Sequence, residues 1–92
     1  MRSKMDADKE KEYLELKNKI SVNIRKYRKQ KHLTQEELAE NANISYDFMR
    51  RIETTKGKCG FSVYTLYKLS LALNVSIDEL MDKNIDELIK NR

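Results

Sequence analysis

The chain has 92 residues, of which 37% are charged and 39% are hydrophobic. This length accommodates one small domain and excludes most multi-step enzymes, because it leaves no room for a second core. Two glycines and no proline are present, so the residues that punctuate β-sandwiches and barrels are scarce and we expect an all-α fold. No run of residues is apolar enough for a membrane span, and the N-terminus lacks the apolar core of a signal sequence, so we expect a cytoplasmic protein.

The 19 basic and 15 acidic residues give a net charge of +4, but the basic excess is concentrated in one segment. Residues 17–33 contain seven basic residues and no acidic residue. This concentration indicates a surface that faces a polyanion, although a solvated, lysine-rich helix face gives the same pattern.

The sequence offers little for metal binding or catalysis. Cys59 is the single cysteine and His32 the single histidine, so an internal disulfide is excluded and a metal cluster is not expected. We interpret His32 as a solvated loop residue rather than a base, because no partner is in view to tune it. We also find no glycine-rich phosphate loop and no nucleophile beside a histidine, so we expect neither an enzyme nor a bound cofactor.

The first predicted helix covers at least residues 18–31 and begins near Asp8. It is indicated by apolar residues that recur at intervals of three or four, namely Tyr13, Leu16, Ile20, Ile24 and Tyr27.

One local pattern then marks four further helix starts. In each, an apolar residue precedes a Ser or Thr, and a second apolar residue follows four positions later. The hydroxyl can accept from a free N–H of the first turn, while the two apolar residues pack as a hydrophobic staple. The four patterns are Leu33-Thr34…Leu38, Ile44-Ser45…Met49, Phe61-Ser62…Leu66 and Val75-Ser76…Leu80. Glu37 and Glu79 complete capping boxes at the first and last of them.

The second and third helices are predicted at residues 35–41 and 46–53, with four residues between them. Such a short connection is typical of a helix-turn-helix. Asn43 lies where this turn needs a positive φ, which asparagine tolerates well. A fourth helix is predicted to end at Asn74, a fifth to follow Ser76, and a short last helix is plausible after Asn84.

A set of spaced residues between positions 20 and 81 follows one pattern. It consists of Ile24…Arg28, Leu33-Thr34-Gln35-Glu36-Glu37-Leu38-Ala39, Ile44-Ser45, Arg51-Ile52-Glu53 and Leu66…Leu69…Ala72-Leu73-Asn74-Val75-Ser76…Leu80. In this pattern the chain resembles the lambda-repressor-like, or Cro-type (XRE), family of helix-turn-helix DNA-binding domains. The chain departs from the family at Asn43 and Thr55, which replace usual glycines, and at Gly60, where a proline is common. We therefore expect an all-α, five-helix domain over residues 18–82, preceded by an N-terminal, partly helical extension (1–17) and followed by a tail or short helix (83–92).

In domains of this kind the third helix lies in the major groove and its exposed residues read base edges. The resemblance assigns that role here to Tyr46, Asp47, Arg50 and Arg51. Each arginine can fork onto guanine O6 and N7. Asp47 either accepts from a cytosine amino group, orients an arginine, or is only a first-turn acid favoured by the helix dipole. Tyr46 either reads a base, contacts a phosphate or is simply exposed.

The resemblance also assigns contacts to the DNA backbone and one structural pair. Arg28 and Glu53 occupy positions that pair in related domains, so we assign them to structure. Lys56 and Lys58 follow the third helix, and a solvated loop explains these two lysines as well as phosphate contacts do. The expected phosphate contacts are Thr34, Gln35, Ser45, Lys56 and Lys58.

The sequence therefore predicts a transcriptional regulator, and most simply a repressor, that binds double-stranded DNA sequence-specifically. The alternative is an antitoxin-type interaction protein that binds a partner protein as well as its own operator. Because one domain covers one half-site, we expect a homodimer on a pseudo-palindromic operator, formed in solution or only on DNA. The first candidate contact surface is the C-terminal stretch with Ile77, Leu80, Met81, Ile85, Leu88 and Ile89. The alternative is that Ile77 and Leu80 complete the domain's own core while residues 82–92 fray. The second candidate surface is the N-terminal group Tyr13, Leu14 and Leu16.

Overall fold

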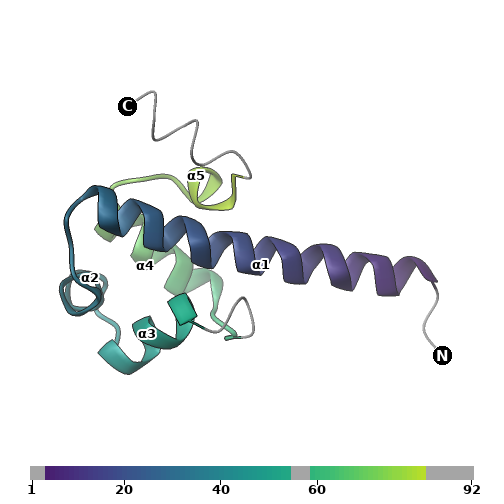
Figure 1. Ribbon diagram of the computed structural model, residues 1–92, viewed down its shortest axis with the longest axis horizontal. Coiled ribbons are helices and arrows are strands. Elements are labelled where there is room, and N and C mark those ends of the chain that lie inside the picture. The colour runs from purple at the N-terminus through teal and green to yellow at the C-terminus, as the bar shows by residue number, and fades with distance from the viewer. Residues whose placement is uncertain (1–3, 55–58, 83–92) are drawn as a thin grey trace.

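The structure is a computed structural model that describes residues 4–54 and 59–82, and over these ranges it contains five helices and no strand (Figure 1). The expected all-α fold is confirmed. Lys56, Lys58 and the helix predicted after Asn84 lie outside the described residues. No described helix is long and apolar enough to cross a bilayer. The helices are α1 (Lys4–Gln30), α2 (Gln35–Ala42), α3 (Tyr46–Thr54), α4 (Val63–Leu73) and α5 (Ile77–Met81).

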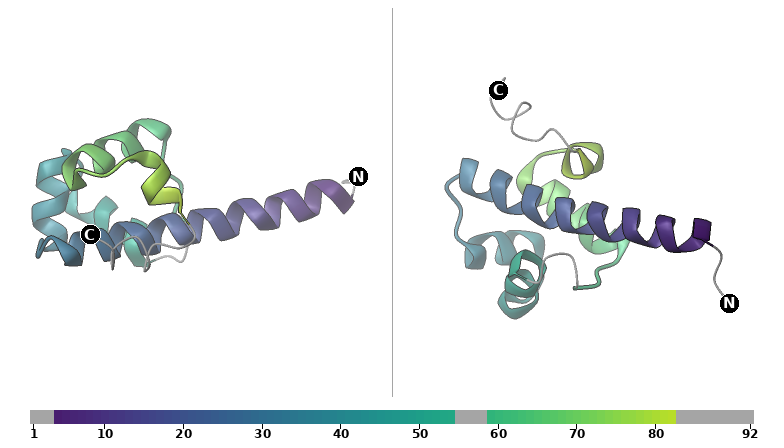
Figure 2. Two further views of the ribbon diagram at one scale, coloured as in Figure 1. Left: turned by 90° about the horizontal axis from the view of Figure 1, so that it is seen from above. Right: turned by 45° about the vertical axis from the view of Figure 1, so that its right-hand side comes forward.

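The first helix is longer than the apolar periodicity predicted. α1 has 27 residues, and its N-terminal half extends beyond the other helices (Figures 1 and 2). Tyr13 and Leu14 in that half are 59% and 54% exposed, whereas Ile24 and Tyr27 in the other half are fully buried. The early start follows from a run of charged helix-forming residues that carries no apolar period.

The core draws apolar side chains from every helix. α2 packs against α3 and α4, while α1 packs against α3, α4 and α5. Leu80, for which both a dimer surface and the core were open, is fully buried and belongs to this core. The core residues are Ile20, Ile24, Tyr27, Leu38, Ala39, Ala42, Met49, Ile52, Leu66, Leu69, Leu73, Val75 and Leu80.

All four predicted N-caps are present. The hydroxyls of Thr34, Ser45, Ser62 and Ser76 each accept from the backbone N–H three residues later, at 3.0–3.1 Å. In return, Glu37 accepts from the Thr34 N–H at 2.9 Å. These hydrogen bonds lower the pKa of the Glu37 carboxyl, because the charged form is the better acceptor. Their stabilising effect is present above the ordinary glutamate pKa and is lost as the pH falls through the lowered value.

Three links between helices share one backbone structure. Each helix ends at a residue with left-handed backbone: φ is 57° at His32, 55° at Asn43 and 55° at Asn74. The N–H of the following apolar residue donates to the carbonyl five positions earlier, at 3.0–3.1 Å, which is the Schellman arrangement. The next residue is the Ser or Thr that caps the following helix. Three residues therefore close one helix and open another, so the directions of both are fixed.

A buried amide anchors α5 to α1. Asn23 is fully buried, and its Nδ2 donates to the carbonyl oxygens of Leu80 and Asp82, both at 2.8 Å. Carbonyls at the end of a helix lack partners within it. Asn23 supplies these partners across 57 residues of sequence to Leu80, a contact that no local pattern indicates.

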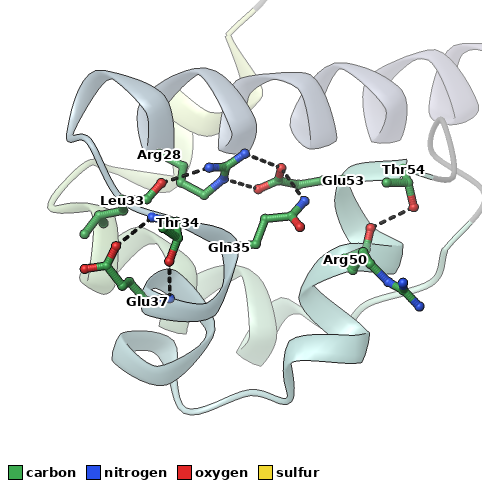
Figure 3. Close-up of polar contacts among 8 residues, drawn as sticks. All are labelled: Arg28, Leu33, Thr34, Gln35, Glu37, Arg50, Glu53 and Thr54. Atoms are coloured by element: carbon green, nitrogen blue, oxygen red, sulfur yellow. Dashed lines mark hydrogen bonds and ion pairs between the residues drawn. The ribbon is translucent and has the colours of Figure 1, made fainter.

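A buried ion pair joins the end of α1 to the end of α3 (Figure 3). Arg28 donates from Nε and Nη2 to the two oxygens of Glu53, at 2.7 and 2.9 Å. Its Nη1 donates to the Leu33 carbonyl at 2.8 Å, and Gln35 Nε2 donates to Glu53 Oε1 at 3.1 Å. The Arg28 and Glu53 side chains are only 11% and 1% exposed. Their charges are therefore satisfied almost entirely by protein groups.

We expect Glu53→Met to lower the free energy of unfolding by about 3–5 kcal/mol, because it leaves the buried Arg28 charge without a partner. Urea denaturation followed by circular dichroism measures this change. The double variant Arg28→Met/Glu53→Met should lose less than the sum of the two single variants, since neither charge is then left alone. Strictly additive losses would show that the pair is not coupled.

We expect His32→Gly to raise the free energy of unfolding by about 0.5–1 kcal/mol, because glycine adopts the left-handed backbone at this position without a Cβ clash. The matched control is Lys29→Gly, three residues earlier and inside α1, which should lower it by about 1 kcal/mol. Equal destabilisation by both glycines would contradict the backbone argument.

Candidate nucleic-acid interface

The exposed face of α3 carries the four side chains that the resemblance assigned to base reading. Tyr46 is 46% exposed, and Arg50 and Arg51 are each 57% exposed as side chains. On the opposite side of the same helix, Met49 and Ile52 are fully buried in the core. The burial of these two residues fixes the rotation of α3 about its axis. The polar face is therefore presented outward on a rigid support, and a helix of this size fits a major groove about 12 Å wide.

The acid on this face pairs with both arginines. Asp47 Oδ2 lies 3.2 Å from Arg51 Nε, and its Oδ1 lies 3.4 Å from Arg50 Nη2. The Arg51 guanidinium also lies over the Phe48 ring, 5.7 Å from its centroid. Phe48 is half-buried against the core, as a large aromatic at a core edge is expected to be. Among the roles open to Asp47, the geometry displays the contact with arginine.

The start of α2 and the start of α3 border a polar hollow of about 480 Å³. Its lining residues are Arg28, Thr34, Gln35, Glu36 and Tyr46. The N–H groups and positive dipole end of α2 attract an anion here, whereas Glu36 opposes one. The Gln35 side chain, expected at a phosphate, donates one N–H to Glu53 and has a second N–H to offer.

A second hollow, of about 280 Å³, is bordered by basic residues of α1 and by the end of α3. We call it the basic hollow; it is lined by Val22, Arg25, Lys26, Lys29 and Glu53. The Glu53 charge is already paired with Arg28, so the three cations give the hollow a positive field. The charge distribution along the sequence pointed to residues 17–33, and the structure identifies which of them lie beside α3.

The remaining expected site residues are placed only in part. The Ser45 hydroxyl oxygen caps α3 by accepting from the Phe48 N–H, and its O–H proton can still be donated. Lys56 and Lys58 lie outside the described residues. His32 is exposed and Cys59 is half-buried. Among the residues that the structure describes, no group of three His, Cys, Asp or Glu side chains could hold a metal ion.

Known proteins share this pattern over most of the chain. A helix-turn-helix family model matches residues 24–80, which run from the C-terminal part of α1 into α5. The chain is also 32% identical, over 68 residues, to y4dJ of Sinorhizobium fredii, an uncharacterised HTH-type transcriptional regulator. That match covers 74% of this chain and 86% of the relative. The chain thus belongs to the XRE-type helix-turn-helix family of DNA-binding domains, the lambda-repressor-like family that its sequence resembles.

Proposed function

We propose that this protein is a transcriptional regulator that binds a specific double-stranded DNA site with α3 in the major groove. The observation that carries the proposal is the outward polar face of α3, held by buried Met49 and Ile52 and bordered by the polar and basic hollows. Base edges are read from the groove floor, whereas phosphates line both of its walls. A polar helix flanked by anion-attracting surfaces fits this geometry.

Within this proposal, the residues divide into two roles. Tyr46, Asp47, Arg50 and Arg51 face the bases. The N-terminal end of α2, with Thr34 and Gln35, and Ser45 face the phosphates of one strand. Lys56 and Lys58, which follow α3 in the sequence, face the phosphates on the far side of the groove. We add Arg25 and Lys29, because both are exposed cations of the basic hollow beside the end of α3.

Repression is the regulatory outcome that this architecture supports most directly. A small domain that fills the major groove of an operator excludes other proteins from the same DNA. A second candidate, the antitoxin-type protein, is favoured by the exposed apolar face of α4, which fits a partner protein. That face consists of Val63, Tyr64, Tyr67 and Leu71, which are 49–77% exposed. Co-purification with the product of a neighbouring gene would support this second function.

Part of each candidate dimer surface lines one apolar groove of about 260 Å³ between α1, α4 and α5, whereas Ile85, Leu88 and Ile89 lie outside the described residues. Tyr13 and Leu16 line it from α1, and Ile77 and Met81 line it from α5. A surface of this kind is costly to leave in water. We propose that a second copy covers it, which would place two copies of α3 on the two half-sites of a pseudo-palindromic operator.

We expect Arg51→Ala to reduce discrimination between the operator and a scrambled duplex by about 1–3 kcal/mol, because a bidentate guanine contact is lost. Lys29→Ala should weaken binding to both duplexes equally and lower the salt slope by about 1, since it removes a phosphate contact. Lys9→Ala, on the projecting half of α1, is the matched control and should change neither. Fluorescence anisotropy titrations at several salt concentrations measure these effects. Equal losses on both duplexes for Arg51→Ala would remove its base-reading role.

We expect Met81→Glu to weaken self-association at least tenfold, because it introduces a charge into the apolar groove. Sedimentation at micromolar concentration, with and without a duplex of two half-sites, measures the assembly. Leu71→Glu, exposed on α4 and not part of the groove lining, should leave the assembly unchanged. A protein that is monomeric both alone and on this duplex would rule out the dimer, whereas pairing only on DNA would support it.

A further inference from the structure

On α3, the exposed side chains of Arg50 and Arg51 both contact Asp47, and the Phe48 ring contacts one of the two arginines. The Asp47 carboxylate touches Arg50 with one oxygen and Arg51 with the other, and the Phe48 ring lies beside the Arg51 guanidinium. These contacts follow the three- and four-residue spacing at which helix neighbours meet. The Arg51 guanidinium therefore contacts both Asp47 and Phe48, whereas the Arg50 guanidinium has the longer contact to the same Asp47 carboxylate.

The atom through which each arginine is held decides what else it can do. A guanidinium carries five N–H donors, one on Nε and four on the two terminal nitrogens. Asp47 meets Arg51 at Nε, 3.2 Å away, and a contact there does not compete with a terminal fork onto guanine O6 and N7. It meets Arg50 at Nη2, 3.4 Å away, and therefore occupies part of the terminal fork.

We propose that Asp47 and Phe48 are positioning residues that hold Arg51 for a guanine, so that Arg51 rather than Arg50 is the principal base-reading arginine of each half-site. The proposal rests on the DNA-binding function proposed above and assigns the residues that determine its specificity. It predicts a guanine in each half-site whose recognition depends on Asp47 without any contact between Asp47 and that base.

The charge of Asp47 gives it a second effect. The Asp47 side chain is 65% exposed, so its ion pairs are screened by water and weak in the free protein. In the groove, water is displaced and the contact with Arg51 strengthens, but the carboxylate also faces the negative field of the phosphates. That repulsion weakens binding to every sequence, whereas the positioned arginine strengthens binding only to a site with a guanine at this position. Asp47 therefore reduces overall affinity and increases discrimination.

The test uses the full chain and an operator selected from a pool of random duplexes, with each base pair of one half-site then changed in turn. We expect Asp47→Ala to bind scrambled DNA more tightly and to reduce the preference for one guanine by about 5- to 150-fold. Asp47→Glu should restore part of that preference, because a longer carboxylate still reaches the arginine four residues later. Circular dichroism confirms that these exposed substitutions leave the fold intact.

A double-variant comparison separates positioning from direct reading. If Asp47 acts through Arg51, Asp47→Ala/Arg51→Ala should show the same guanine preference as Arg51→Ala alone. Arg50→Ala should keep the preference for this guanine, because any base that Arg50 contacts lies elsewhere in the half-site, and should lower the affinity for the operator. The proposal would be overturned if Asp47→Ala and Arg51→Ala reduced the preference at two different base pairs and the two losses added in the double variant. Loss of the guanine preference in the single variant Arg50→Ala would also overturn it. An unaltered protein that selects no sequence would instead refute the proposed function.

Discussion

The bonds between Arg28 and Glu53 close a polar network to which α1, α2 and α3 all contribute. Both charges are almost completely removed from water, so the structure tolerates them only where their hydrogen bonds are satisfied. Arg28 meets Glu53 and the Leu33 carbonyl, and Glu53 also accepts from Gln35 at the first turn of α2. A rotation of α3 would break several of these bonds at once. Arg28 borders the polar hollow and Glu53 the basic hollow, so the pair fixes α3 relative to both hollows.

Short helices need such external constraints. α2 has eight residues and α3 has nine, lengths at which an isolated helix is scarcely populated in water. The left-handed links supply part of the stability that these short helices lack. Each link satisfies the last carbonyls of one helix and positions the cap of the next. The apolar residue inside each link packs on the core as well. The helix-turn-helix is thus one rigid unit rather than two helices on a flexible turn.

The features that the sequence predicts well are those whose partners are near in the chain. The four caps were predictable because each hydroxyl, its N–H partner and its apolar staple lie within a few residues. The left-handed backbone at Asn43 and Asn74 was predictable from residue type, whereas the same conformation at His32 was not, since histidine adopts it less readily than glycine or asparagine. The role of Asn23 could not be predicted from the sequence, because its side chain caps a carbonyl 57 residues away. The basic hollow could not be predicted, because only the packing of α1 against α3 places these cations beside the end of α3.

Under the proposed function, the distribution of charge assigns affinity and discrimination to different helices. The exposed face of α3 carries Asp47, Arg50 and Arg51, a net charge of only +1, because the Glu53 charge is buried against Arg28. The six basic residues of 17–33 other than Arg28, with no acid among them, would supply most of the attraction to a polyanion from α1 and the link that follows it. A reading helix of low net charge gains little from non-specific contact with phosphates, so its base contacts can dominate the difference between sequences. The ion pair between Arg28 and Glu53 would connect these two proposed roles mechanically: the basic helix proposed to attract the DNA also sets the orientation of α3, the helix proposed to read it.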